Sequence, residues 1–324
     1  MGESLERVSE KMIVEVDGVD YGYSLYYSYL LPLFDIEPTE NGFVFRKVVG
    51  FCSRIECVFH RDSLKTVCKI PPNCVEYSKH VLGIDSRWGF KELCRVYGYD
   101  NCVAEKITLI YSPKDARLVF YTILLSRNTD YFVNTLRWLK ELVYTGGIRG
   151  GSYITKQFLE IRESVDRTFD STEKIDELAI SLLRLRYVGL KTVSAFLLHA
   201  FGLTEHAPID RHYMWYLSRT LPSFKYVQIR KEVCIRSKLN CFSCPYRERC
   251  LYGATKIFGK LNGYIQSLAY LSKRMSMARN TIEEILVPRG HRDIRSLENI
   301  VKAVIEKVVG DANKNAGLRP FPTW

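Results

Sequence analysis

Four cysteines in one short segment constrain this 324-residue chain more than any other feature. Cys234, Cys241, Cys244 and Cys250 lie within residues 234–250, separated by six, two and five residues. Four thiolates so close together can surround a single metal centre, either zinc or an iron–sulfur cluster. Zinc sites more often show two close cysteine pairs, and here only Cys241 and Cys244 are close. The spacing alone leaves both metals open, and it predicts a loop folded around one of them.

The positive charge of the chain is concentrated in the same region. The formal net charge is +11, and residues 181–260 contain 14 Lys and Arg against 4 Asp and Glu. Such a concentration indicates a polyanionic partner, most simply the phosphates of a nucleic acid, although a solvated basic surface is the plainer alternative.

The remaining composition indicates a globular protein outside the membrane. The length suggests two domains, or one core with additions. The polar start of the chain does not resemble a secretory signal, and no apolar run is long enough to span a bilayer. We therefore expect a cytoplasmic protein, or a nuclear one if its source has a nucleus. Free thiols or metal ligands are then expected rather than disulfides, and the six N-terminal cysteines are interpreted as buried core thiols.

The hydrophobic pattern changes once along the chain. Short runs of branched and aromatic residues predict strands between Met12 and Ile70, followed by a helix at 88–97 and a strand at 106–111. Beyond Pro113 the apolar period becomes helical. It predicts helices at 116–125 and 131–144, and one begun by an Asp170–Glu173 capping box. We predict an N-terminal α+β domain (1–112), a helical core (113–222), a cysteine loop (223–255) and a helical extension (256–324).

A lysine and an aspartate stand out within the predicted core. Val188 and Gly189 form a very short turn between two helices, and such a turn exposes backbone N–H groups that favour an anion. Lys191 lies in the first turn of the second helix, where the helix dipole disfavours its charged form. The dipole, together with burial, is expected to lower the pKa of Lys191 and free the amine to act as a nucleophile. Asp210 opens a further helix over 211–220. It either caps that helix or presents a carboxylate to the site of Lys191.

These residues resemble the helix-hairpin-helix DNA glycosylase superfamily, whose members share the hairpin, the following lysine and the downstream aspartate. The resemblance covers about Ala116 to Arg219, and it implies a mainly α fold with the N-terminal α+β domain added. The cysteine run resembles the [4Fe–4S] loop of endonuclease III and of the adenine-specific mismatch glycosylases. By contrast, the N-terminal domain and the segment Pro208–Trp215 resemble 8-oxoguanine glycosylase, which has no cluster. Two positions depart from the family: Arg127 stands where endonuclease III-like members carry Gln, and Tyr187 replaces the first glycine of the hairpin.

The resemblance implies a role for each of these residues. Lys191 and Asp210 would be catalytic, and the four cysteines would hold a [4Fe–4S] cluster that orders the loop. Aromatic walls for a base pocket could come from Tyr187, Phe196, Trp215 and Tyr216, although each of these residues is more often part of a core. The expected DNA contacts are Arg127, Val188, Gly189, His212, Arg236, Lys238, Arg247 and Arg249.

The implied function is that of a bifunctional DNA glycosylase and abasic-site lyase of base excision repair. Its partner would be double-stranded DNA with a damaged base or an abasic site, and we expect a monomer. The sequence does not choose between an oxidised pyrimidine and 8-oxoguanine. A non-catalytic DNA-binding protein that kept the hairpin and cluster is the main alternative, and a zinc nuclease is a weaker one.

Overall fold

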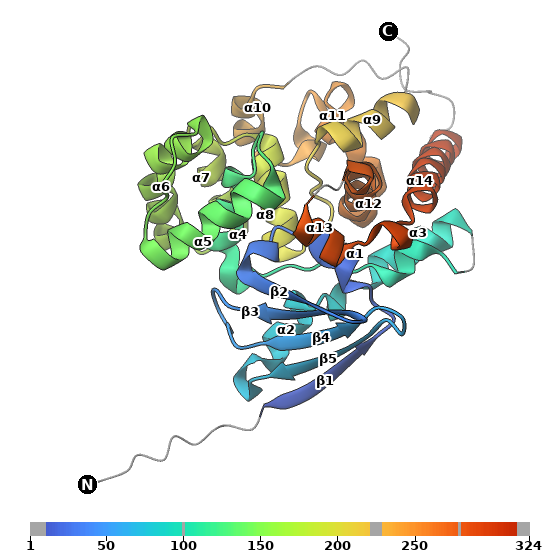
Figure 1. Ribbon diagram of the computed structural model, residues 1–324. Coiled ribbons are helices and arrows are strands. Elements are labelled where there is room, and N and C mark those ends of the chain that lie inside the picture. The colour runs from blue at the N-terminus through green and yellow to red at the C-terminus, as the bar shows by residue number, and fades with distance from the viewer. Residues whose placement is uncertain (1–10, 99–100, 221–228, 278–279, 316–324) are drawn as a thin grey trace.

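The N-terminal part of the chain forms an antiparallel sheet with one face covered by helices (Figure 1). The computed structural model describes residues 11–98, 101–220, 229–277 and 280–315. The strand order is β1-β5-β4-β3-β2, and all neighbours are antiparallel. The strands are β1 (Met12–Asp17), β2 (Phe34–Thr39), β3 (Gly42–Lys47), β4 (Glu56–His60) and β5 (Lys65–Ile70).

Alternating burial along the central strands explains why this segment forms a sheet. In β3, β4 and β5 every second side chain is buried, as a strand with one covered face requires. Phe45 and Phe59 on that face pack against Tyr21 of the helix α1 (Tyr21–Tyr26), with ring centroids 5.1 and 6.2 Å from the Tyr21 ring. The strands predicted between Met12 and Ile70 are confirmed.

The strand predicted at 106–111 is wrong. A 3₁₀ turn, η4 (Val103–Lys106), is followed by extended backbone that pairs with no strand in the described part of the chain. Its residues Ile107, Leu109 and Ile110 are buried in the core, which explains their apolar character. The segment carries the chain from the sheet to the helical part, beside α2 (Val75–Val81) and α3 (Trp88–Tyr97).

The interpretation of the six N-terminal cysteines as free thiols is also wrong, although five of the six are buried as expected. The absence of a signal-like start did not predict their state, because the fold brings them together in pairs. One pair faces across β4 and β5 in register, and another closes a short loop after α3. The three disulfides are Cys52–Cys74, Cys57–Cys68 and Cys94–Cys102.

The helical part begins as predicted and then differs at one helix start. The helix α4 (Ala116–Leu125) is followed by a π-helical turn, η6 (Tyr131–Thr135), and by α5 (Leu136–Thr145), which ends at Gly146. Asp170 does not begin a helix. It lies in the last turn of the long helix α6 (Tyr153–Ser171), where its carboxylate pairs with Arg117. The capping-box pattern was misleading because the Asp170 carboxylate forms an ion pair with Arg117 and does not accept from the backbone N–H groups of a following helix.

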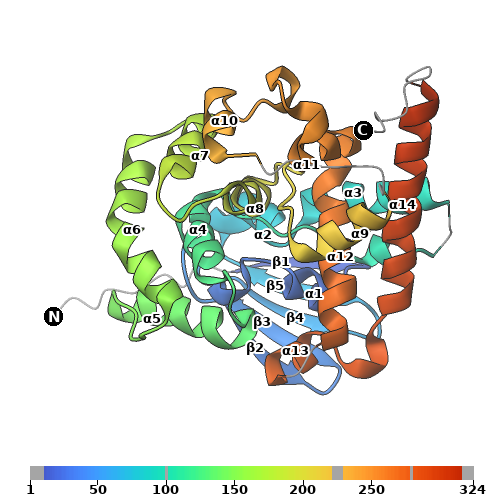
Figure 2. The same ribbon diagram turned by 90° about the horizontal axis from the view of Figure 1, so that it is seen from above.

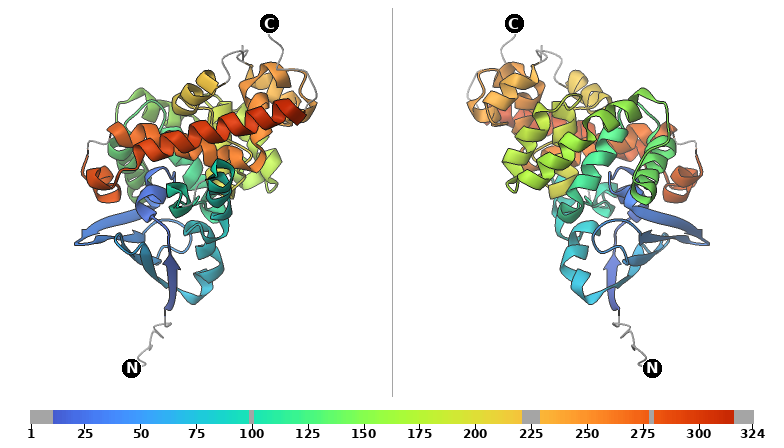
Figure 3. Two further views of the ribbon diagram at one scale, coloured as in Figure 1. Left: turned by 90° about the vertical axis from the view of Figure 1, so that its right-hand side faces the viewer. Right: turned by 90° about the vertical axis from the view of Figure 1, so that its left-hand side faces the viewer.

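The helix α8 (Leu190–Phe201) lies at the centre of the molecule, and nine of its twelve residues are buried (Figure 2). It packs against α4 and α7 (Ile175–Arg184), and the C-terminal helix α14 (Ile294–Asn315) packs across α3 and α12 (Asn262–Arg274) (Figure 3). The predicted boundary between 222 and 223 lies outside the described residues. The remaining helices are α9 (Arg211–Thr220), α10 (Lys231–Arg236), α11 (Leu251–Ala254) and α13 (Thr281–Leu286).

Short 3₁₀ turns connect these elements: η1 (Leu31–Leu33), η2 (Pro72–Cys74), η3 (Ile84–Ser86), η5 (Pro113–Asp115), η7 (Cys241–Ser243), η8 (Arg247–Arg249), η9 (Thr255–Leu261), η10 (Met275–Met277) and η11 (Arg289–His291). Among the residues that the structure describes, no helix combines the length and the apolar character needed to cross a membrane.

A buried ion pair joins the sheet to the helical part. The ammonium of Lys47, at the end of β3, lies 2.9 Å from the Asp115 carboxylate just before α4, and both side chains are almost fully buried. The same ammonium donates to the carbonyl oxygens of Val49 (2.7 Å) and Phe51 (2.6 Å). Burial lowers the pKa of Lys47 although Asp115 opposes this shift. Three acceptors therefore depend on one buried cation.

Replacing Lys47 with methionine is expected to lower the free energy of unfolding by about 3–5 kcal/mol, because it leaves the Asp115 carboxylate buried without its cation. Denaturant titration of the purified variant measures this change. The matched control is Lys65→Met, since Lys65 pairs with Glu15 on the solvent-exposed side of the sheet. Exposed pairs contribute about 0–1 kcal/mol, so equal losses in the two variants would contradict the structural role of Lys47.

Candidate active site

The hairpin predicted between α7 and α8 is present, and its turn faces open space. Gly189 precedes the first residue of α8, and a Cβ added there would meet no atom within 4 Å. Val188 is buried and anchors the turn in the core. Tyr187 adopts a left-handed conformation with φ of 62°, which glycine adopts without steric cost and other residues rarely adopt. Its hydroxyl donates to Glu160 (2.8 Å), so its ring lies away from the open side of the turn.

Two cations hold this turn from opposite sides. The Arg127 guanidinium, from the break after α4, donates to the Tyr187 carbonyl oxygen (2.6 Å). The Lys231 ammonium, at the start of α10, donates to the carbonyl oxygens of Leu185 (2.8 Å) and Val188 (3.3 Å). The cysteine segment therefore supports the hairpin directly. Arg127 is engaged within the protein, and its contact with DNA stays a prediction.

Lys191 and Asp210 line one cavity of about 710 Å³. Lys191 is exposed, so the expectation that burial would activate its amine is wrong, and no described carboxylate forms an ion pair with it. Asp210 is 9% exposed. One of its carboxylate oxygens accepts from the backbone N–H groups of His212 (3.0 Å) and Tyr213 (2.8 Å), and the other accepts from Gln266 (3.2 Å). Asp210 thus caps α9 and also presents its carboxylate to the cavity.

His212 lines the same cavity, next to the Asp210 carboxylate. Its ring meets Tyr270 edge to face, with centroids 5.5 Å apart. Burial lowers the pKa of His212, and the Asp210 charge acts in the opposite direction. His212 was predicted to contact a phosphate, and that contact stays a prediction. Its position shows that it belongs to the wall of the cavity.

The aromatic wall of the cavity comes from residues that the sequence did not indicate. Phe196 and Tyr216 are buried in the core, and neither these two nor Tyr187 and Trp215 line the cavity in the described part of the chain. The wall instead joins the N-terminal region near α1, the π-helical turn and α12. A neighbour of Arg127, Asn128, also lines it. The aromatic residues of this wall are Tyr27, Tyr29, Tyr131 and Tyr270, with His199 beside them.

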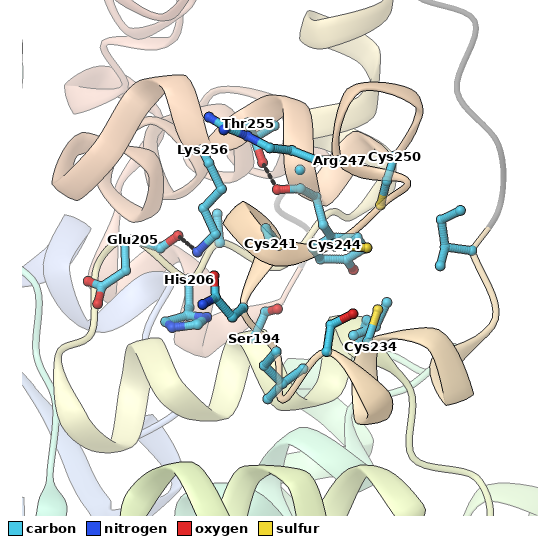
Figure 4. Close-up of a pocket in the computed structure, with 18 of the residues that line it drawn as sticks. Ser194, Glu205, His206, Cys234, Cys241, Cys244, Arg247, Cys250, Thr255 and Lys256 are labelled. Carbon is cyan, nitrogen blue, oxygen red and sulfur yellow. Dashed lines mark hydrogen bonds between the residues drawn. The ribbon is translucent and has the colours of Figure 1, made fainter.

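The four C-terminal cysteines are free thiols and line a second cavity, next to the first half of α8 (Figure 4). Burial raises the pKa of Cys234 to about 12 and also raises that of Cys241. Leu190 and Ser194 of α8 form the facing wall. Among the described residues, no three His, Cys, Asp or Glu side chains lie close enough to hold one metal ion. The four thiols therefore share a cavity but do not converge on a single point.

Four of the basic side chains predicted to reach DNA belong to the same cysteine segment. Arg236, Lys238 and Arg249 are exposed, whereas Arg247 lines the second cavity and lies over the Phe242 ring, 4.6 Å from its centroid. Their segment contacts the hairpin turn through Lys231. Their contact with DNA stays a prediction that affinity measurements can test.

Removing two exposed charges, Arg236→Ala with Arg249→Ala, is expected to make duplex binding less dependent on salt. Each lost phosphate contact reduces the number of counterions released. We expect the slope of log affinity against log salt to become shallower by about 1–2 units. The control replaces Lys69 and Lys79 of the sheet region, which removes the same charge away from the hairpin. If both double variants keep the slope of the wild type, DNA does not bind at the cysteine segment.

Comparison with known proteins places the fold. No protein-family model and no curated protein matches the chain. Solved structures of 8-oxoguanine glycosylase/lyase from Clostridium acetobutylicum do match. The complex with double-stranded DNA containing cytosine opposite 8-oxoguanine has a TM-score of 0.52 at 14% identity, and covers 84% of this chain and 100% of that one. The apo form has a TM-score of 0.50 at 14% identity, with coverage of 80% and 98%.

A third solved structure, MBOgg1 in complex with a low-affinity DNA ligand, has a TM-score of 0.50 at 12% identity, with coverage of 80% and 94%. At these identities the comparison establishes a shared fold. The chain is mainly helical with an N-terminal antiparallel sheet, like these glycosylase/lyases, and this confirms that part of the sequence-based expectation. The likeness to endonuclease III rests on the cysteine segment and stays a prediction.

Proposed function

We propose that the protein is a DNA glycosylase and abasic-site lyase that excises an oxidised base from double-stranded DNA. One observation carries the proposal: Lys191 and Asp210, from two different helices, line the same cavity beside an open hairpin turn. A base within a duplex is inaccessible, so it must be extruded into such a cavity before reaction. The solved structures of Clostridium acetobutylicum 8-oxoguanine glycosylase/lyase share this fold, and one of them holds double-stranded DNA that contains 8-oxoguanine.

In the proposed reaction, the neutral amine of Lys191 attacks C1′ of the damaged nucleotide. The C1′–N bond breaks, the base leaves with the bonding electron pair and gains a proton, and the amine loses a proton. The sugar ring then opens as O4′ departs from C1′ and takes up a proton, which gives a protonated imine. Loss of a proton from C2′ forms the C2′–C3′ double bond, and the 3′ phosphate leaves with the electrons of its C–O bond.

Asp210 is assigned an electrostatic role in this scheme. The sugar develops positive charge as the base departs, and a fixed carboxylate stabilises that charge. The hydrogen bonds from Gln266 and from the first turn of α9 keep the carboxylate in place before the reaction. Oriented donors of this kind remove the need for reorganisation at the moment of bond breaking. Asp210 therefore needs no movement to act on the sugar.

We also propose that Cys234, Cys241, Cys244 and Cys250 hold a [4Fe–4S] cluster. The donor set fits, because four free thiols line one cavity. The spacing, with one close pair (Cys241 and Cys244) and two outlying cysteines, favours an iron–sulfur cluster over zinc, whose sites more often have two close pairs. When bound, such a cluster crosslinks four points of the chain and thereby orders the loop. Through Lys231, an ordered loop also fixes the hairpin turn.

Aerobically purified protein is expected to be brown, with broad absorbance near ~400 nm and iron rather than zinc on metal analysis. Cys241→Ser should lose the iron and, because the loop supports the hairpin, also bind duplex DNA more weakly. Ser243→Ala is the control, since Ser243 lies in the same turn and offers no thiolate. One zinc per chain and no iron would rule out the cluster.

Borohydride trapping on a panel of duplexes tests the whole proposal. The panel contains 8-oxoguanine, an oxidised pyrimidine, an abasic site and undamaged DNA. The proposal predicts a trapped covalent complex with the abasic duplex and with at least one damaged base, and none with undamaged DNA. If the protein binds every duplex and traps none, it is a non-catalytic DNA-binding protein.

A further inference from the structure

One residue in the wall of the active-site cavity has a buried polar atom without a partner. His199, near the end of α8, is 2% exposed, and its Nδ1 forms no hydrogen bond with any described residue. His199 lines the same cavity as Lys191 and Asp210. A buried polar atom without a partner destabilises the folded state, so native proteins keep few of them. The wall of the cavity therefore contains a buried imidazole whose hydrogen-bonding capacity is not used within the described part of the chain.

The surroundings of His199 fix the orientation of its ring. The Tyr29 ring meets it edge to face with centroids 4.9 Å apart, and the Tyr27 ring lies 6.1 Å away. The Tyr27 hydroxyl donates to the Thr108 carbonyl oxygen (2.7 Å), so this neighbour is itself held in place. Burial lowers the pKa of His199 to about 3. The imidazole is therefore neutral at physiological pH and can offer either an N–H donor or a lone-pair acceptor.

The position of His199 along α8 suits recognition of a base. Lys191 lies in the first turn of the helix, and His199 follows eight residues later. At the rise of an α-helix, the two Cα atoms are separated by about 12 Å along the axis. Lys191 must reach the sugar, so a base that projects from that sugar into the cavity extends toward the His199 end. One helix thus presents the nucleophile and a polar group for the base.

We propose that His199 is a specificity-determining residue, whose imidazole hydrogen-bonds to the polar edge of the extruded base. The inference rests on the proposed glycosylase function and adds to it the residue that recognises the base. An uncharged imidazole suits this task, because nucleobases are neutral and present paired donors and acceptors at their edges. A substrate that satisfies a buried polar group is strongly preferred over one that leaves it unpaired.

The test replaces His199 with phenylalanine and with asparagine. Phenylalanine keeps a ring against Tyr29 but removes the polar atoms, whereas asparagine keeps a donor and an acceptor. We expect His199→Phe to lower kcat/KM for excision of the damaged base about 10- to 100-fold. Lyase activity on a pre-formed abasic duplex should stay within about twofold of wild type, because no base is present. His199→Asn should recover part of the excision rate.

Thermal unfolding separates recognition from a structural role. Removing an unpaired buried polar atom should leave the Tm of His199→Phe unchanged or raised, while excision falls. Phe196→Leu is the matched control on α8, because Phe196 is fully buried and packs on Phe120 outside the cavity. This control should lower the Tm by a few degrees and keep the ratio of excision to lyase activity.

Two outcomes would overturn the proposal for His199: excision by His199→Phe within about twofold of wild type, or an equal loss of excision and lyase activity together with a lower Tm. Both differ from a failure of the proposed function. In that case wild-type protein itself would neither excise a base nor cleave an abasic duplex, and the inference would fail with it.

Discussion

Lys191→Gln is expected to abolish borohydride trapping on both damaged and abasic duplexes. The substitution keeps length and polarity but removes the amine that joins C1′, so no imine can form. The Lys191 side chain is exposed and makes no ion pair with a described carboxylate, so its removal costs little stability. Duplex affinity and Tm should therefore stay close to those of wild type. Gel electrophoresis of the trapped complex measures the first effect.

The control for this experiment is Lys156→Gln. Lys156 is an exposed lysine of α6, and it does not line the active-site cavity in the described residues. It should trap as wild type does. If Lys191→Gln is still trapped on damaged DNA, another amine forms the imine and the assignment of the nucleophile is wrong.

Asp210→Asn should slow removal of the damaged base by about 100-fold or more, because it withdraws the charge that stabilises the developing sugar cation. Asparagine can still cap α9 through its side-chain oxygen, so the fold should persist. Trapping on a pre-formed abasic site should fall less, since no base has to leave. Single-turnover excision kinetics on the two duplexes measure the difference.

A second capping aspartate provides the comparison. Asp20 is buried and caps α1 by accepting from the Tyr23 backbone N–H (3.2 Å), away from the cavity walls. Asp20→Asn makes the same chemical change and should leave excision unaltered. Equal losses in Asp20→Asn and Asp210→Asn would mean that the effect is one of folding rather than of charge at the sugar.

Local signals predicted the part of the site that neighbouring residues determine. Gly189 and Gly202 bound α8 in the structure, and Asp210 opens α9 as its position before an apolar run indicated. These features depend on backbone groups within a turn or two of the residue, so one sequence is enough to find them. The sharing of a cavity by Lys191 and Asp210 followed from the family resemblance.

The rest of the site depends on contacts between distant segments. The Tyr27 and Tyr270 rings reach the cavity from opposite ends of the chain, and nothing near either residue in sequence marks it as a pocket wall. In the sequence, His199 is one residue of an apolar helix and nothing marks it as functional. Only the structure shows that its Nδ1 is buried without a hydrogen-bond partner among the described residues. A signal was available for one disulfide, because Cys57 and Cys68 lie within the region predicted to form strands and are paired across β4 and β5 in the structure. Free thiols were expected instead, because the start of the chain does not resemble a secretory signal.

The ten cysteines fall into two groups, disulfide-bonded and free, that must not pair with each other while the chain folds. The first six form pairs that are 22, 11 and 8 residues apart, and the last four remain thiols. Synthesis runs from the N-terminus, so each pair can close while Cys234 and its neighbours are still untranslated. A full-length denatured chain has no such protection, because all ten sulfurs are present together. Oxidative refolding of the full-length chain would therefore allow disulfides between the six N-terminal cysteines and the four C-terminal ones. Synthesis from the N-terminus prevents such pairs, because the first six cysteines can pair before the last four are made.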